Sequence, residues 1–102
     1  MLLKQKINKG QEMNKFKEKD SQYLGWTNRE TWNVMLWINN TENLYFGVAN
    51  ILRTMTYTPT YREVIYILNL EDCQTGDGIS YLNDKLNYEE LNNAIENIKG
   101  TI

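Results

Sequence analysis

The chain contains no histidine among its 102 residues, and it has a single cysteine and a single proline. Without histidine, the commonest general base, the Ser–His and Cys–His nucleophile pairs and the commonest metal ligand are all missing. The one cysteine, Cys73, cannot form an internal disulfide, and without a second cysteine it does not make half of a zinc site. We therefore expect a protein that is not an enzyme and that holds no cofactor or metal. An enzyme built on carboxylates and tyrosine is the alternative that this composition leaves open.

Phosphate-binding loops and membrane helices are also missing from the sequence. Neither GxGxxG nor GxxxxGK[ST] occurs among the six glycines. The longest mostly apolar runs fall well short of the roughly 20 residues that a membrane-spanning helix needs. The first residues, MLLKQKINKGQE, contain no long apolar segment and no small-residue cleavage site, which speaks against a signal peptide. With a single cysteine, these absences favour a protein of a reducing cytoplasm without a membrane partner.

Charge is divided unevenly along the chain. Residues 1–22 carry six lysines and three acidic groups, a net charge of +3, whereas residues 23–102 carry five basic and ten acidic groups, a net charge of −5. An acidic body is unsuited to binding nucleic acid through counter-ion release, but it suits a basic surface on another protein. We interpret residues 1–22 as a basic, flexible tail and residues 23–102 as one compact helical domain, because the chain is too short for two cores.

Helical periodicity and helix-starting residues together predict a mainly α fold, a compact domain of four helices. The pattern T-x-x-E, which is typical of a capping box, occurs at Thr27 and at Thr60, and Asn87 precedes an acidic first turn. The expected helices span about 28–38, 42–55, 61–70 and 88–98.

One short β element is compatible with this pattern. Residues 79–82 alternate apolar and polar side chains after a loop rich in turn-forming residues. A strand needs a partner, and residues 55–57 are the other candidate. A two-stranded ribbon between these segments is therefore an addition to the helical fold that the sequence leaves open.

The three tryptophans lie within a dozen residues, and helical phase assigns them different positions. Trp32 falls on the apolar face of the first helix, so we expect it in the core. Trp26 precedes the expected cap, where an apolar side chain can pack back onto the first turns. Trp37 falls on the opposite, polar side, which it shares with Arg29 and Asn33.

Two further rings fall outside the apolar stripes of their helices. Phe46 and Tyr66 both lie among polar neighbours when residues 42–55 and 61–70 are placed on a helical wheel. One interpretation is that other parts of the chain cover these rings and Trp37, with the tail or the loop at residues 71–82 as the cover. The other is a contact patch for a partner or a second copy, because aromatic side chains carry much of the binding energy of interfaces.

The loop after the third helix is acidic, with Glu71, Asp72 and Asp77, and Asp84 follows it. Its spacing does not match the D-x-[DN]-x-[DN]-G pattern of a calcium loop, and no glutamate closes the pattern. A solvated, turn-forming loop is the simpler interpretation. The same carboxylates are suited to steering the protein toward a basic, nucleic-acid-binding channel on another protein.

The run from Gly25 to Trp37, GWTNRETWNVMLW, resembles the G-W-T-N-x-E-T-W-x-V-x-L-W signature of small proteins encoded by bacteriophages and prophages. The pieces LEDC at residues 70–73 and DGISY at residues 77–81 are similar to the same group. The resemblance covers roughly residues 23–98 and leaves out the basic tail. It implies an accessory protein of a phage, a setting in which small acidic inhibitors of host defence are common.

From this resemblance we expect a stoichiometric inhibitor of a host defence system, anti-CRISPR or anti-restriction, that acts in the host bacterial cytoplasm by binding a CRISPR effector or restriction component. A nucleic-acid-binding accessory protein that uses the tail lysines and a self-assembling structural protein, for example a homodimer, are the alternatives. The side chains expected to contact the partner are Trp37, Phe46, Tyr66, Arg29, Asn33, Glu71, Asp72 and Asp77.

Overall fold

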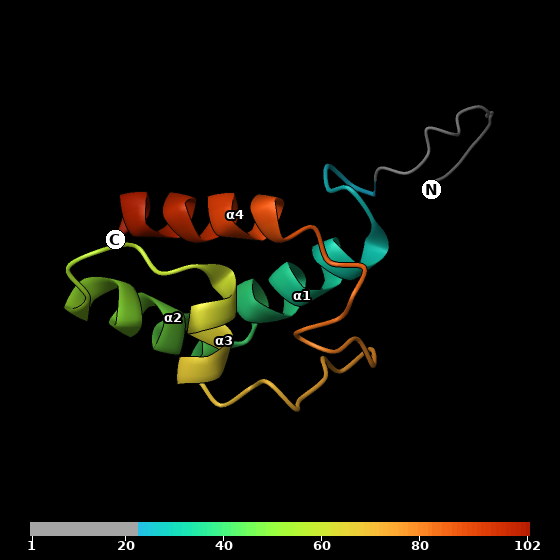
Figure 1. Cartoon of the computed structure of the whole chain (residues 1–102), viewed down its shortest axis with the longest axis horizontal. Coiled ribbons are helices and arrows are strands. Elements are labelled where there is room, and N and C mark those ends of the chain that lie inside the picture. Colours follow the sequence, from blue (N-terminus) through green and yellow to red (C-terminus); the bar gives the residue numbers. More distant parts are fainter. Residues whose placement is uncertain (1–22) are drawn as a thin grey trace.

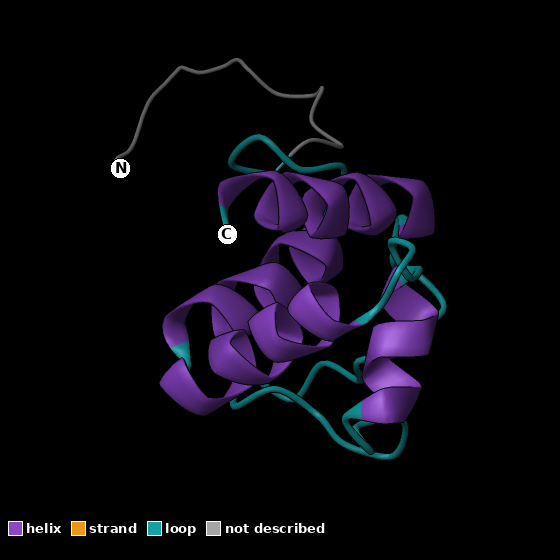
Figure 2. Cartoon of the chain, turned by 90° about the vertical axis from the view of Figure 1, so that its left-hand side faces the viewer, coloured by secondary structure: helices purple, strands orange, loops and turns teal. Residues whose placement is uncertain are grey.

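The computed structural model describes residues 23–102, so the tail predicted for residues 1–22 lies outside the described residues. The described part is a mainly helical domain with four helices, as the sequence predicts (Figures 1 and 2). The helices are α1 (Arg29–Asn40), α2 (Glu42–Thr54), α3 (Tyr61–Ile67) and α4 (Tyr88–Thr101). The third helix is shorter than expected and the fourth is longer. No helix in this part of the chain is long and apolar enough to cross a membrane.

The helix starts confirm two of the predicted caps and correct one. Thr60 and Glu63 form the expected capping box at α3, and the Asn87 side chain accepts from the Glu90 backbone N–H at α4. At α1, however, the N-cap is Asn28, whose side chain accepts from the Thr31 backbone N–H. The predicted capping box at Thr27 is wrong because the Thr27 hydroxyl instead accepts a hydrogen bond from Asn87 of the α4 start, at 2.9 Å.

The core lies where α4 crosses the other helices. α4 contacts α1, α2 and α3, and it lies across α1 and α2 in Figures 1 and 2. Tyr61 is fully buried, and its hydroxyl donates to the Tyr81 carbonyl oxygen at 2.8 Å, so the long loop before α4 is tied to the interior. Lys99 donates to the Leu52 carbonyl oxygen at 2.9 Å, which satisfies an unpaired carbonyl at the C-terminal end of α2. The fully buried apolar residues are Val34, Met35, Ile38, Val48, Ala49, Leu52, Tyr61, Val64, Ile65, Leu91 and Ile95.

The β element takes a different form from the predicted ribbon. Within residues 23–102, residues 55–57 form no β bridge. Ser80 instead forms an isolated β bridge with Gln74, which lies in the loop between α3 and α4. Gly78, with a φ of +87°, makes the tight turn between them. A partner six residues away costs less chain entropy than one more than twenty residues away, which accounts for the local pairing. This turn, residues 73–81, is called the 73–81 loop below.

Candidate functional site

The starts of α1 and α4 are joined by side chains of the tryptophan-rich run. Asn28 caps α1 and also accepts from the Thr31 hydroxyl at 2.6 Å, while that hydroxyl accepts from the Asn87 backbone N–H at 2.9 Å. The Asn28 amide donates to the Lys85 carbonyl oxygen at 2.6 Å. Thr31 is fully buried. These polar residues therefore fix the two helix starts to each other, and their role is structural.

Asn33 is fully buried, although helical phase places it on the polar side of α1. Its amide nitrogen donates to Asp77 Oδ2 at 2.7 Å, and its amide oxygen accepts from the Thr75 hydroxyl at 2.7 Å. The same Thr75 hydroxyl accepts from the backbone N–H groups of Asp77 and Ile79, each at 3.2 Å. Asn33 thus has partners from the 73–81 loop, and it is not accessible to another molecule in this structure.

Trp37 is half-buried beneath the same loop. Its indole Nε1 donates to Asp77 Oδ2 at 2.9 Å, and its ring lies so close to Gly76 that an added Cβ there would overlap it. Of the two interpretations made from the sequence, cover by the loop therefore describes Trp37. Only glycine allows the loop backbone to approach the indole this closely.

Asp77 accepts two of the three side-chain hydrogen bonds that hold the loop on α1. The donors Trp37 and Asn33, in that order, lower the pKa of the Asp77 carboxyl, because they stabilise its charged form. The exposed Arg29 guanidinium adds a smaller effect in the same direction, and desolvation opposes it. The structure therefore brings together Asn33, Trp37 and Asp77 through hydrogen bonds within the chain, and Arg29 acts on Asp77 through its charge.

Phe46 and Tyr66 are open to solvent, with 58% and 53% of their surface exposed. Phe46 lies on α2, where its ring is 6.5 Å from that of the half-buried Tyr45. Beside Tyr66 at the end of α3, Ile67 is also exposed. Helical phase places these rings correctly because, unlike Trp37, neither has a loop folded over it.

The remaining acidic residues of the predicted set differ in their surroundings. Asp72 is exposed on the loop that follows α3. Glu71 is half-buried, and its Oε1 is a buried oxygen without a hydrogen-bond partner in the structure. No group of three or more acidic or cysteine side chains in residues 23–102 is placed to hold a metal ion.

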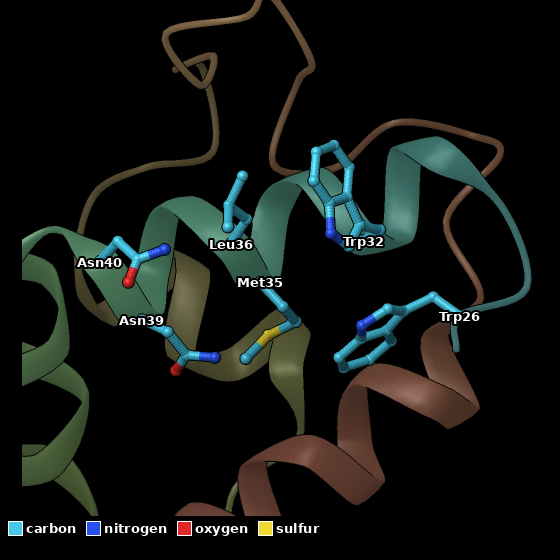
Figure 3. Close-up of a pocket in the computed structure, with 6 residues that line it drawn as sticks. All are labelled: Trp26, Trp32, Met35, Leu36, Asn39 and Asn40. Carbon is cyan, nitrogen blue, oxygen red and sulfur yellow. The ribbon is translucent and has the colours of Figure 1, made fainter. Parts of the chain in front are cut away.

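The sequence did not predict the two hollows that share Trp26, one lined by residues of α1 and the other by residues of α4. Trp32, expected in the core, is half-buried and lines one of these hollows, while its ring packs on that of Tyr23 at 5.0 Å. Trp26 lines two hollows of about 260 and 170 Å³, which we call together the Trp26 groove. Figure 3 shows the larger hollow. The larger hollow is lined by Trp26, Trp32, Met35, Leu36, Asn39 and Asn40. The smaller is lined by Gly25, Trp26, Glu90, Asn93, Ala94 and Asn97. One sequence feature is consistent with these hollows, because the bulky indoles of Trp26 and Trp32 flank the start of one helix.

Fold and site together define a small, mainly helical protein with a loop closed over one face of α1, a groove on another and two exposed rings. Comparison with known protein families assigns the chain to one family. The chain belongs to a family of unknown function, DUF7249, whose model matches residues 19–100. No curated protein matches it. No solved structure matches it either.

Proposed function

We propose that this protein is a phage-type accessory protein that binds a host defence protein, a CRISPR effector or a restriction component, and blocks it stoichiometrically. The observation that supports the proposal best is the exposure of Phe46 and Tyr66 on an acidic domain. Large apolar side chains are costly to leave in water, and aromatic residues dominate the energetic centres of interfaces. An inhibitor of this kind acts by occupying a surface and needs no catalytic group.

In this proposal the two rings provide binding affinity, and the carboxylates steer the protein electrostatically toward its partner. Phe46 and Tyr66 bury their apolar surface against the partner, while exposed acidic groups such as Asp72 steer the domain toward a basic, nucleic-acid-binding surface. Trp37 is no longer an anchor of first choice, because Asp77 and Gly76 hold it beneath the 73–81 loop. The place of action that follows from the proposal is the host bacterial cytoplasm.

The test is capture of a host protein by purified variants that remain folded. Tagged wild-type protein is incubated with host lysate, and the captured proteins are identified by mass spectrometry. We expect Phe46→Ala combined with Tyr66→Ala to lower capture of the specific partner at least tenfold. Asn50→Ala, which removes another exposed side chain of α2, is the matched control and should capture normally. Equal capture by the double variant and the control, with unchanged circular dichroism, would remove the support for this contact surface.

Self-association is a second candidate, and the same exposed Phe46 favours it. An apolar ring on one copy can pack against its equivalent on another across a two-fold axis. Sedimentation velocity at increasing protein concentration distinguishes the two functions. A dimer that Phe46→Ala dissociates supports self-association, whereas a monomer at all concentrations leaves the rings for a foreign partner.

A further inference from the structure

The larger hollow of the Trp26 groove has the lining of a side-chain pocket. The indoles of Trp26 and Trp32 lie toward one end, the Asn39 carboxamide lies toward the other, and the Met35 thioether lies between the Trp26 ring and Asn39 (Figure 3). No ionisable side chain lines it. Its volume of about 260 Å³ is below the roughly 300–1,000 Å³ of drug-sized ligand sites, so it suits one large apolar side chain.

The α4 side of the groove is acidic. Glu90 lines the smaller hollow together with Asn93. Glu89 and Glu96 are exposed, and they stand four residues before and three residues after Asn93 on the same helix. Residues with these spacings are neighbours on a helix surface, so a row of carboxylates borders the groove. The fitting occupant therefore carries an aromatic or aliphatic side chain between positive charges.

The chain supplies such a segment at the edge of the groove. Tyr23 packs its ring on Trp32, and its backbone pairs with that of Trp26, so the residues that precede it join the domain beside the larger hollow. Seven residues before Tyr23 stands Phe16, between Lys15 and Lys17. Seven extended residues span up to about 25 Å. The part of α1 that lines the hollow runs over nine residues from Trp32 to Asn40 and is about 12 Å long, so Phe16 can reach any part of it.

We propose that the Trp26 groove is a docking site for this chain's own N-terminal segment, with Phe16 in the larger hollow and the flanking lysines against the carboxylates of α4. Residues 1–22 lie outside the described residues, and the proposal stands on the groove, the attachment point and the charges. The net charge of +3 on residues 1–22 complements the −5 of residues 23–102. A short tether raises the effective concentration of such a segment to the millimolar range, so even a weak contact is largely formed.

The docked segment shields two half-buried tryptophans from solvent and from other molecules. A foreign segment with the same chemistry would have to displace it before entering the groove. This inference does not depend on the proposed inhibitor function, because it concerns contacts within one chain.

The experiment compares the full-length protein with Phe16→Ala by following the three indole N–H signals in NMR spectra. Each signal is assigned through a single Trp→Phe variant. We expect Phe16→Ala to shift the signals of Trp26 and Trp32 and to leave that of Trp37 in place, because Trp37 is bound to Asp77 outside the groove. Phe46→Ala, which removes an exposed ring from α2, is the control and should shift neither groove signal. Raising the salt concentration to about 0.5 M should reproduce part of the Phe16→Ala shift, since it screens the lysine–carboxylate attraction.

A second variant, Lys15→Glu combined with Lys17→Glu, tests the charge component in the full-length chain. It should shift the same two signals in the same direction as Phe16→Ala. The proposal is overturned if Phe16→Ala leaves the Trp26 and Trp32 signals unmoved, in which case the groove is open to a foreign segment. Groove signals that move with protein concentration also contradict it, because the occupant would then belong to a second copy.

Discussion

Two faces of α1 carry one tryptophan each, and the chain treats them in opposite ways. Trp37 donates to Asp77 and lies over Gly76, so the 73–81 loop closes that face. Trp32 lines the larger hollow of the Trp26 groove and has Tyr23 as its aromatic neighbour. Both rings are half-buried, although one falls on the polar side of the helix and the other on its apolar face. The difference between them is that the 73–81 loop offers the Trp37 indole a hydrogen-bond acceptor.

The largest expected effect comes from removing the buried amide that holds the loop. Asn33→Ala leaves the Thr75 hydroxyl without its acceptor and Asp77 without one donor, which should lower the free energy of unfolding by about 2–3 kcal/mol. Urea unfolding followed by circular dichroism measures this loss. Asn50→Ala, at an exposed position of α2, should change it by less than about 0.5 kcal/mol. Similar losses for the two variants would mean that the loop does not depend on Asn33.

The close contact between the 73–81 loop and the Trp37 ring can be tested at Gly76. Gly76→Ala places a methyl group in the Trp37 ring, so the loop must move away, at a cost of about 1–3 kcal/mol in the free energy of unfolding. Gly100→Ala is the matched control, because an added Cβ there meets no atom within 4 Å. In a Trp37→Ala background the cost of Gly76→Ala should largely disappear, since the clashing ring is gone. A cost that persists in that background would point to backbone strain and away from the contact.

Removing the N-cap of α1 should have a smaller effect on the free energy of unfolding. Asn28→Ala removes the hydrogen bond to the Thr31 backbone N–H and the link to Lys85, and we expect a loss of about 1–2 kcal/mol in unfolding free energy. Thr27→Ala removes only an acceptor for Asn87 and should cost less, about 0.5–1 kcal/mol. Thermal unfolding of both variants ranks them. The reverse ranking would restore Thr27 as the cap, as its T-x-x-E pattern predicts.

Acid should weaken the closed face, where Asp77 holds the 73–81 loop on α1. Because the pKa of Asp77 is lower in the folded protein than its ordinary value of 3.8, its ionised form stabilises the fold above that pH. This stabilisation is lost as the pH falls below about 3.8 through the folded-state value. The urea midpoints of wild type and Asp77→Asn should therefore differ at pH 7 and converge as the pH approaches 2. A difference that stays constant over this pH range would show that the charge of Asp77 does not stabilise the loop.

Much of this fold follows from local signals in the sequence. The four helices, the capping box at Thr60 and the cap at Asn87 depend on residues close to each other in the chain, and periodicity and composition report on them. Phe46 and Tyr66 are exposed for the same reason, since their helices present them away from the core.

The parts that sequence reasoning missed depend on contacts between distant residues. The partners of Asn33 and Trp37 lie about forty residues later, in an irregular loop that no periodicity describes. Asn28 caps α1 in place of Thr27, because the Thr27 hydroxyl accepts a hydrogen bond from Asn87 at the start of α4. Trp32 falls on the apolar arc of its helix, but the groove leaves that part of the arc only partly covered. Helical phase gives the direction of a side chain and does not show what lies there.

The most direct test of the difference between the two faces is hydrogen exchange of the indole N–H groups, measured for Trp32 and Trp37 in the same NMR sample. The Trp37 group donates to Asp77, so Asp77→Ala should speed its exchange with solvent and leave the exchange of the Trp32 group unchanged. A Trp37 exchange rate that stays the same in Asp77→Ala would contradict a loop closed over Trp37.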